Sequence, residues 1–339
     1  MSNRSMRFTP QRLPNTLGIG SVAAQVAEIC SLDDLIAARA VLSSDHSPIV
    51  LGAGSNVVLP PRVERPVLLM RVRGLRLTEI GAGIARLDVG AGETWHDVVR
   101  FALGQGYRGL ENLALIPGTA GAAPVQNIGA YGVEIASCLE SVEVFDWSRG
   151  QLDRWSAAAC EFGYRDSLFK HAAGRGRIIL GISLVLSRSG PVDVNYPDLA
   201  RELNRFGKNN PQPIDIAEAV IRVRRRKLPD PRRTGNAGSF FKNPLITSAH
   251  SEALAREEPD LIRYPQADGR VKLAAGQLID RCGWRGRHQG KAGVWLRQAL
   301  VLVNVGGADA RDLLDLAAAI QGDVAARYGV VLDIEPQVL

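Results

Sequence analysis

The stretch IPGTAGAAPVQNIGAYG, residues 116–132, decides how the rest of the chain is interpreted. Four of its residues are glycine, several more are alanine, and none carries a charge. Glycine is favoured where a Cβ would clash or where φ must be positive. The two amides in the stretch, Gln126 and Asn127, can each donate and accept hydrogen bonds. We therefore expect a flat, anionic ligand to lie close to this backbone.

A second glycine turn, GAGSN at residues 52–56, interrupts the apolar stretch SPIVLGAGSNVVLP. We expect it to join two strands. Successive N–H groups in such a turn form a concave nest that binds phosphate oxygens, although a plain hairpin turn explains the sequence equally well. Two uncharged loops of small residues within one domain favour one extended ligand that both loops contact.

A third glycine pattern has a structural explanation. Residues 104–109 read GQGYRG and match the dinucleotide pattern G-x-G-x-x-G. That pattern must follow a strand and open a helix, so that the helix N-terminus meets the pyrophosphate. Here the glycines close the predicted helix WHDVVRFALGQ and serve as its C-terminal cap. The P-loop pattern G-x-x-x-x-G-K-[ST] does not occur, so a P-loop nucleotidase is not expected.

Composition bounds the protein class. A length of 339 residues predicts two or three domains, and the apolar fraction of 46% is ordinary for a soluble globular protein. The formal net charge of +6 suits an anionic ligand or nucleic acid. No cysteine pair reads C-x-x-C and no histidine pair reads H-E-x-x-H, so we expect no metal site. No apolar signal or membrane-spanning stretch is evident, and we expect a cytoplasmic protein.

The chain alternates predicted helices and strands without repeats. Helices are expected over 32–42 and 95–105, each after a capping-box pattern, and over 215–227, 272–283 and 308–329. Between them lie short strands, and the last ten residues are expected to form a closing strand. Residues 189–213 are expected to be a polar loop with one helix.

Several polar residues have both a plain and a functional explanation. Most arginines of the run 222–227 are best explained as a solvated helix face, whereas Lys227, beside Leu-Pro-Asp-Pro, is better placed to meet an anion. Ser239 is a turn serine that could donate a proton if nearby cations stabilised its alkoxide. Arg165 and Glu335 are ordinary surface residues when taken alone. Nucleic-acid binding lacks a recognisable module.

Together these stretches resemble one family, the UDP-N-acetylenolpyruvoylglucosamine reductases. The motifs that carry the resemblance occur in the family's order and span nearly the full chain: LGAGSN (51–56), IPGTAGAAPVQNIGAYG (116–132), YRDSLFK (164–170), RKLPDP (226–231), GNAGSFFKNP (235–244), AAGQLID (274–280), RQALVLVN (297–304) and IEP (334–336). Two departures are Gln337, where an acidic residue is common, and Trp295, where histidine is common.

The resemblance implies a mixed α+β and α/β fold. An FAD-binding domain of the vanillyl-alcohol-oxidase type, made of two α+β subdomains, would precede a smaller α/β substrate-binding domain. The implied limits are 1–220 for the first domain, with subdomains at about 1–72 and 73–220 and with strand 330–339 returning to it. The second domain would span 221–329.

The resemblance also implies a reaction. NADPH would reduce noncovalently bound FAD, and the enolpyruvyl C3 of UDP-N-acetylglucosamine enolpyruvate would then receive hydride. A proton added at C2 would give UDP-N-acetylmuramate for peptidoglycan synthesis, and hence for cell-wall biogenesis, cell shape and cell division. The alternatives are a flavin-dependent oxidase of the same superfamily and a non-enzymatic nucleotide or nucleic-acid binder.

Roles follow residue by residue from the resemblance. Arg165 would stabilise the enolate-like state, Ser239 would deliver the proton to C2, and Glu335 would assist it. The residues implied to bind substrate are Tyr164, Tyr196 on a mobile loop, Lys227, Asn243 and Gln298. The residues implied to bind FAD are Gly52, Ala53, Gly54, Ser55, Asn56, Ile116, Pro117, Gly118, Thr119, Gly121, Gln126, Asn127, Gly129 and Ala130. NADPH would use the substrate's site in turn. The protein would be a monomer that binds neither nucleic acid nor membrane.

Overall fold

The computed structural model describes residues 6–42 and 47–339, so part of the N-terminal stretch in which no signal peptide is expected lies outside the described residues. The chain divides into two compact units. Unit 1 comprises Met1–Gln11, Ala23–Ala53 and Val63–Arg224, and unit 2 comprises Arg12–Val22, Gly54–Arg62 and Arg225–Leu339. Each unit is a compact group of residues and is not a test of the domain limits expected from the sequence. Those limits stay a prediction.

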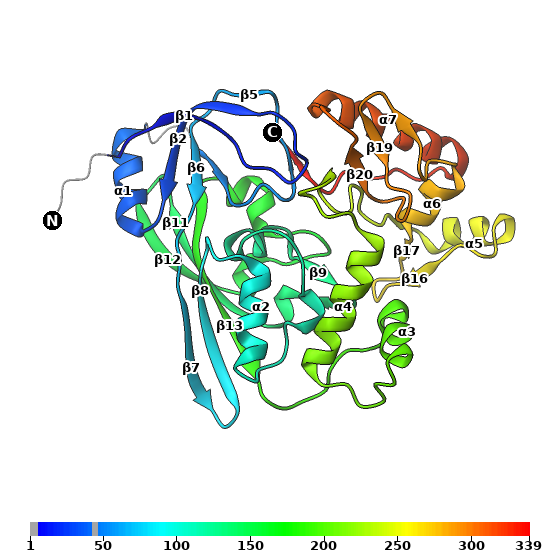
Figure 1. Cartoon of the computed structure of the whole chain (residues 1–339), viewed down its shortest axis with the longest axis horizontal. Helices are drawn as coiled ribbons and strands as arrows, with labels where there is room; N and C mark the ends of the chain where they lie inside the picture. The colour runs from blue at the N-terminus through cyan, green and yellow to red at the C-terminus, as the bar shows by residue number, and fades with distance from the viewer. Residues whose placement is uncertain (1–5, 43–46) are drawn as a thin grey trace. The chain divides into compact units, whose positions relative to one another are not determined.

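Helices and strands share the described residues, with short 3-10 turns between them (Figure 1). The α-helices are α1 (Leu32–Val41), α2 (Trp95–Gly104), α3 (Pro197–Arg205), α4 (Pro213–Lys227), α5 (Ser248–Glu257), α6 (Ala275–Arg281) and α7 (Ala310–Tyr328). The strands of the first half are β1 (Thr9–Arg12), β2 (Val22–Ile29), β3 (Ile49–Leu51), β4 (Val57–Val58), β5 (Arg62–Val63), β6 (Val67–Met70), β7 (Leu75–Gly81), β8 (Ile84–Gly90), β9 (Gly129–Ala130), β10 (Val133–Glu134), β11 (Leu139–Asp146) and β12 (Gln151–Ser156). The remaining strands are β13 (Arg177–Ser187), β14 (Gly235–Asn236), β15 (Leu245–Ile246), β16 (Arg263–Pro265), β17 (Val271–Leu273), β18 (His288–Gln289), β19 (Ala292–Val294), β20 (Leu302–Asn304) and β21 (Gln337–Val338).

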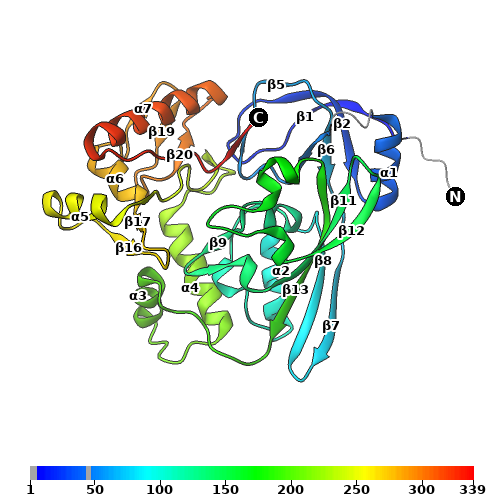
Figure 2. The same ribbon diagram turned by 180° about the vertical axis from the view of Figure 1, so that it is seen from behind.

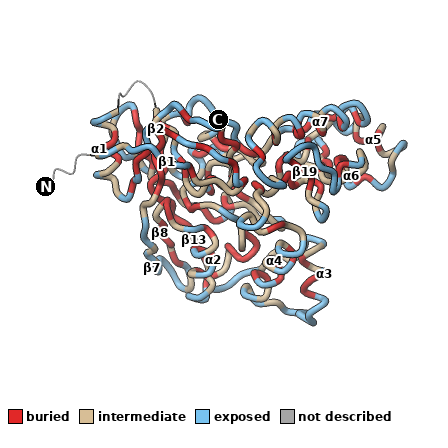
Figure 3. The backbone as a smooth tube through the Cα atoms, turned by 45° about the horizontal axis from the view of Figure 1, so that its top comes forward, coloured by how far each residue is buried: buried red, intermediate tan, exposed pale blue. Residues whose placement is uncertain are grey.

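The larger sheet of unit 1 is antiparallel, in the order β12-β11-β13-β8-β7. Figure 2 shows its strands side by side, with the β7–β8 hairpin extending beyond the others. Strand β13 is largely buried, alternate residues of β8 are buried, and β7 is largely exposed (Figure 3). The alternating burial of β8 is typical of a strand with one face on a core and one face toward solvent.

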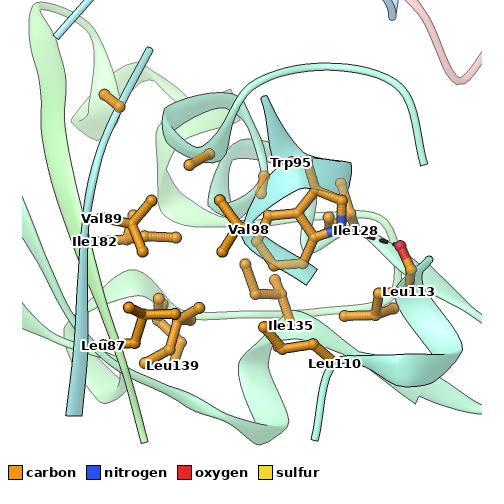
Figure 4. Close-up of a cluster of buried hydrophobic side chains, with 14 of the residues drawn as sticks. Leu87, Val89, Trp95, Val98, Leu110, Leu113, Ile128, Ile135, Leu139 and Ile182 are labelled. Carbon is orange, nitrogen blue, oxygen red and sulfur yellow. Dashed lines mark hydrogen bonds between the residues drawn. The ribbon is translucent and has the colours of Figure 1, made fainter. Parts of the chain in front are cut away.

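Helix α2 covers the buried face of this sheet. Its Val98 side chain lies opposite Val89 and Ile182 of the sheet (Figure 4), and all three are almost completely buried. The Nε1 of Trp95 donates a hydrogen bond of 3.0 Å to the carbonyl of Leu113, which satisfies the polar atom of a buried indole. Ala120, Ala123 and Ile128 of the 116–132 stretch belong to the same buried cluster.

A smaller sheet of unit 1 has the order β1-β2-β6-β3, with β5 beside β2. Strands β2, β6 and β3 are parallel, and β6 is buried along its whole length. Helix α1 connects β2 to β3, as expected for a parallel connection. The turn 52–56 therefore does not form a hairpin, because β3 pairs with β6 and β4 pairs with β21.

Unit 2 contains the antiparallel sheets β14-β20-β19-β18 and β15-β17-β16, and β21 pairs in parallel with β4. Helix α7 lies beside β19 and β20 in Figures 1 and 2. Asp309 caps the start of α7 and Asp312 bonds back to it, while Gly329 ends the helix at φ +63°. These are the boundary signals of a capping box and a left-handed C-cap.

Some local expectations are wrong. The Thr94 side chain does not cap α2, and α4 begins at Pro213, two residues before the expected Asp215. Asp215 instead accepts a hydrogen bond from the Gln212 N–H, which holds the first turn of α4. The closing strand is confined to Gln337–Val338, and α5 was not expected at all.

A buried carboxylate stabilises the end of β11. Burial alone would raise the pKa of Asp146, but hydrogen bonds from Ser148 and Arg149 outweigh burial and hold the pKa well below its usual range. Arg177 also pairs with this carboxylate. Because the folded pKa is depressed, the stabilisation is present above the unfolded pKa of about 3.9 and is lost as pH falls toward the folded value.

We therefore expect Asp146→Asn to lower the free energy of unfolding by about 2 kcal/mol at neutral pH, since charged hydrogen bonds are lost. The deficit should shrink below pH ~4, where the wild-type carboxylate loses its advantage. Urea denaturation at several pH values measures both effects. Asp153→Asn is the matched control, because Asp153 is 36% exposed and contacts the same Arg149. An equal loss in both variants would contradict this account.

Candidate functional site

The backbone of the 116–132 stretch is irregular. Two 3-10 turns, η2 (Ala120–Ala122) and η3 (Pro124–Gln126), follow one another. Asn127 has φ +46° and Tyr131 has φ +50°, a left-handed conformation that few residues other than glycine adopt. Gly118, at φ +121°, lies in a region that is essentially restricted to glycine. The glycines are therefore needed for the path of the backbone as well as for space.

The two predicted cofactor loops meet within unit 1. A Cβ on Gly52 would lie 2.4 Å from the Thr119 Oγ1. A Cβ on Gly121 would lie 2.5 Å from the Cβ of Ala91. The structure thus brings Gly52 of one loop against Thr119 of the other, and a side chain at either glycine would displace the loop.

Two consecutive N–H groups in the second loop lack an acceptor. The backbone N–H groups of Gly118 and Thr119 donate to no acceptor within residues 6–42 and 47–339, although Thr119 is only 8% exposed. Buried N–H groups are nearly always paired in native proteins. Such a pair of donors beside an uncharged, side-chain-poor surface can bind an oxygen-rich ligand.

The first glycine turn divides between the units. Gly52 and Ala53 belong to unit 1, and Gly54, Ser55 and Asn56 belong to unit 2. Gly54 has φ +65°, and a Cβ there would lie 2.1 Å from the carbonyl oxygen of Pro14. The close approach of the segment that contains Pro14 explains why residue 54 is glycine, without reference to a ligand.

Arg165 occupies a tight turn of unit 1 with φ +53°. The turn is closed by two backbone hydrogen bonds between Gly163 and Asp166, of 3.0 and 3.2 Å. One Arg165 Nη donates to the carbonyl of Gly129 at 2.6 Å, and the guanidinium lies over the ring of Tyr164, 5.4 Å from its centroid. The structure therefore brings three predicted site residues together: Tyr164, Arg165 and Gly129.

Arg224 and Tyr131 of unit 1 lie near this turn. Burial lowers the pKa of Arg224, and the neighbouring charge of Arg165 lowers it further. The buried Nε of Arg224 has no hydrogen-bond partner in the part of the chain that the structure describes. The ring of Tyr131 meets that of Tyr196 edge to face, with centroids 5.1 Å apart. Arg224 is thus not part of a solvated helix face, whereas Arg225 and Arg226 are exposed.

In unit 2 the chain brings Ser239 and Glu335 into neighbouring backbone segments. The Glu335 N–H donates to the carbonyl of Phe240 at 2.9 Å, next to Ser239. Phe240 and Phe241 are fully buried and hold this segment. The Ser239 hydroxyl is partly buried and makes no hydrogen bond with the described residues. It does not bond to its own turn, so the plain explanation of this serine is wrong.

Asn56 lies beside Glu335 in the same unit. Its side-chain amide is 3.4 Å from the Glu335 carbonyl oxygen, and its own carbonyl accepts from the Gln337 N–H at 3.0 Å. The last residues of the chain are thereby attached to the second half of the GAGSN turn.

The predicted substrate residues Asn243 and Gln298 gather at the first turn of α6. The Asn243 Oδ1 accepts from the Ala275 N–H at 3.0 Å. A Cβ on Gly276 would lie 2.9 Å from the Gln298 Oε1, so this glycine makes room for the glutamine. Lys227, the last residue of α4, belongs to the same unit.

The remaining cofactor candidates lie in the second loop: Ile116, Gln126 and Ala130 have intermediate exposure, and Pro117 is exposed. No group of three or more His, Cys, Asp or Glu side chains that could hold a metal occurs in the described residues. Nor does any helix among them have the length and apolar character to cross a membrane.

Arg224 was not singled out from the sequence, although the helical pattern contained a signal for it. Helix α4 buries Ile216, Ala217, Val220 and Val223, and position 224 follows Val220 by four residues and Ala217 by seven. That spacing places position 224 on the buried face of the helix. The run of neighbouring arginines concealed it. Trp295, the departure noted above, has a buried Nε1 without a hydrogen-bond partner among the described residues.

Comparisons with known proteins agree with these features. Residues 23–155 match a family model described as an FAD binding domain. Residues 230–339 match a model described as the C-terminal domain of UDP-N-acetylenolpyruvoylglucosamine reductase. The protein of that name from Bordetella pertussis is 49% identical over 96% of this chain and 92% of its own. The one from Paraburkholderia phymatum is 48% identical over 96% and 95%.

A solved structure is similar over the same extent. The UDP-N-acetylenolpyruvylglucosamine reductase from Thermus caldophilus has a TM-score of 0.67 and 26% identity, covering 98% of this chain and 99% of that one. The expected fold class, a mixed FAD-binding domain followed by a smaller domain, is confirmed. The assignment of individual site residues stays a prediction.

Proposed function

The chain belongs to the family of UDP-N-acetylenolpyruvoylglucosamine reductases, and we propose that it catalyses the NADPH-dependent, FAD-mediated reduction of UDP-N-acetylglucosamine enolpyruvate to UDP-N-acetylmuramate. The observation that carries the proposal is the 49% identity that extends over 96% of the chain. The relatives are named reductases, which favours this function over the oxidase alternative.

The loops of unit 1 fit FAD. The unpaired N–H groups of Gly118 and Thr119 suit the oxygens of a pyrophosphate, and Gly52 and Gly121 let the loop that carries these groups pack closely, with Thr119 against Gly52 and Gly121 against Ala91. Bound FAD would supply the hydride-transfer chemistry that no side chain can provide. No His or Cys occurs in either loop, consistent with noncovalent binding.

The chain's own residues would orient the substrate and manage charge and protons. Hydride addition at C3 of the enolpyruvyl group leaves negative charge on C2 and the carboxylate. Arg165, preorganised by Gly129, would stabilise that charge. Ser239, whose hydroxyl has no partner in the described chain, would donate the proton to C2, and Glu335 would assist it.

We further propose that Tyr164, Tyr196, Lys227, Asn243 and Gln298 bind the substrate, with NADPH using the same site in turn. The protein would act as a cytoplasmic monomer, without nucleic-acid or membrane partners. Its product would serve cell-wall biogenesis and thereby cell shape and division.

Gln298→Ala is expected to raise KM for the enolpyruvyl substrate about tenfold while kcat changes little, because one hydrogen bond to a charged group is lost. Steady-state kinetics measure both parameters. Gln321→Ala is the matched control, since Gln321, on α7, is also partly buried but donates to the carbonyl of Leu332. A fall in kcat at unchanged KM would contradict a binding role for Gln298.

The proposed reaction is tested by following NADPH oxidation without oxygen. Oxidation that depends on the enolpyruvyl substrate supports the reductase. Oxygen consumption with an alcohol or sugar, and no NADPH oxidation, would support the oxidase instead.

A further inference from the structure

We propose that Glu134 is a positioning residue that, together with Asn127, holds the guanidinium of Arg165 in its working orientation. This inference deepens the proposed function and rests on it, because it assumes that Arg165 stabilises charge on the substrate. Neither Glu134 nor the Asn127 side chain needs to touch substrate or cofactor for this role.

The backbone of Arg165 needs support. Its left-handed φ of +53° costs an arginine about 1–2 kcal/mol, because the Cβ approaches the following carbonyl. The conformation persists because the surrounding turn enforces it, and the Lys170 Nζ donates to the Arg165 carbonyl at 3.2 Å. Backbone strain of this kind is characteristic of functional sites.

The Arg165 guanidinium is held by a backbone carbonyl and faces a carboxylate. One Nη donates to the Gly129 carbonyl at 2.6 Å, and the other lies 3.9 Å from the Glu134 carboxylate. The Arg165 side chain is 19% exposed. A Cβ on Gly129 would lie 2.9 Å from Arg165 Nη1 and 2.9 Å from Glu134 Cγ, so glycine at 129 makes room for this pair.

Glu134 is itself fixed by Asn127. The Asn127 Nδ2 donates to the second carboxylate oxygen of Glu134 at 2.7 Å and to the Gly163 carbonyl at 3.0 Å. The Asn127 Oδ1 accepts from the Ala136 N–H at 3.2 Å. Both N–H bonds of this buried amide, only 1% exposed, are therefore used within the protein.

One amide thus ties together the glycine loop, the strand that carries Glu134 and the turn that carries Arg165. The arrangement orients Arg165 before substrate arrives, and a preorganised charge needs no reorganisation during the reaction. It also gives the Asn127 side chain a different purpose from the cofactor contact expected from the sequence. The Asn127 backbone N–H is likewise used within the protein, since it donates to the Pro124 carbonyl at 3.1 Å.

The test is Glu134→Gln in the FAD-loaded enzyme. Glutamine retains the shape and an oxygen for Asn127 but removes the charge that faces Arg165. We expect flavin reoxidation by the enolpyruvyl substrate to slow about tenfold, because a small misplacement of a catalytic group is costly. Flavin reduction by NADPH and FAD content should be unchanged. Glu140→Gln is the matched control, since Glu140 is equally exposed at 38% and lies 4.0 Å from Arg86.

A double-mutant cycle decides whether Glu134 acts through Arg165. In an Arg165→Ala background, Glu134→Gln should cause no further slowing of reoxidation. Asn127→Gly is the second variant, because glycine keeps the left-handed backbone and removes only the amide. It should slow the same half-reaction and also lose its effect without Arg165.

The outcomes distinguish a failure of the positioning role of Glu134 from a failure of the proposed function. The positioning role is overturned if Glu134→Gln slows flavin reoxidation equally with and without Arg165. It is also overturned if Glu134→Gln slows reoxidation no more than Glu140→Gln does. If Glu134→Gln does not fold, the Asn127→Gly cycle decides by the same criteria. An unmodified enzyme that never reduces the enolpyruvyl substrate overturns the proposed function instead.

Discussion

Ser239→Ala is expected to slow reoxidation of the reduced flavin by the enolpyruvyl substrate by ~10² to 10⁴-fold, the usual contribution of a general acid. The reduction of flavin by NADPH should be unaffected, because that half-reaction needs no proton at the substrate C2. Rapid-mixing measurements of the flavin absorption resolve the two half-reactions.

The contacts around Ser239 in unit 2 indicate that Ser239→Ala should not disturb the fold. The backbone beside Ser239 is bonded to Glu335 and rests on two buried phenylalanines, so removal of one oxygen should leave the fold intact. Ser248→Ala, on the exposed start of α5, controls for the loss of a hydroxyl in the same unit. If both half-reactions slowed equally in Ser239→Ala, the proton-donor role would be wrong.

Gly121→Ala is expected to abolish tight FAD binding. The new Cβ would lie 2.5 Å from the Ala91 Cβ and 3.1 Å from the Ala91 Cα and carbonyl oxygen. No side-chain rotation relieves that contact, so the loop that carries Gly118 and Thr119 must move. Overpacking of this kind costs about 1–3 kcal/mol, which corresponds to roughly 10- to 100-fold in affinity if the loop reaches its binding conformation less often.

Gly104→Ala is the matched control for this substitution. Gly104 ends α2, and a Cβ there would meet nothing within 4 Å. Alanine should therefore leave FAD affinity unchanged and stabilise the helix slightly. Fluorescence titration of the flavin-free proteins with FAD measures both variants. Retention of normal FAD affinity in Gly121→Ala would show that the loop does not form the binding surface.

The sequence predicted elements best where boundary chemistry is local. The helix expected over 308–329 is observed as α7, Ala310–Tyr328, because its capping by Asp309, Asp312 and Gly329 involves residues only a few positions apart. The rejection of the 104–109 pattern is also confirmed, since Gly104 closes α2 and Gly106 follows at φ +78°.

Long-range partners were harder to predict. The GAGSN turn was weighed as a hairpin, but its flanking strands pair with β6 and β21, and β21 is more than 270 residues away along the chain. Similarly, nothing local to Asn127 indicates that its amide binds the carbonyl of Gly163, 36 positions away. Both contacts depend on how the backbone crosses in space.

The arginine run in α4 was misleading because its local composition concealed the helical spacing. The arginines at the end of α4 suggested a solvated face, yet helical spacing separates partly buried Arg224 from its exposed neighbours. Periodicity should outweigh local composition when a charged run lies on an amphipathic helix.

The central claim is that flavin on this chain carries reducing equivalents from NADPH to an enolpyruvyl group. One equivalent of NADPH added to the FAD-loaded protein without oxygen should bleach the visible flavin absorption, and one equivalent of UDP-N-acetylglucosamine enolpyruvate should restore it. Mass spectrometry should then find the substrate converted to a product with two additional hydrogens. Flavin that stays reduced after the substrate is added, with the substrate recovered unchanged, would contradict the account.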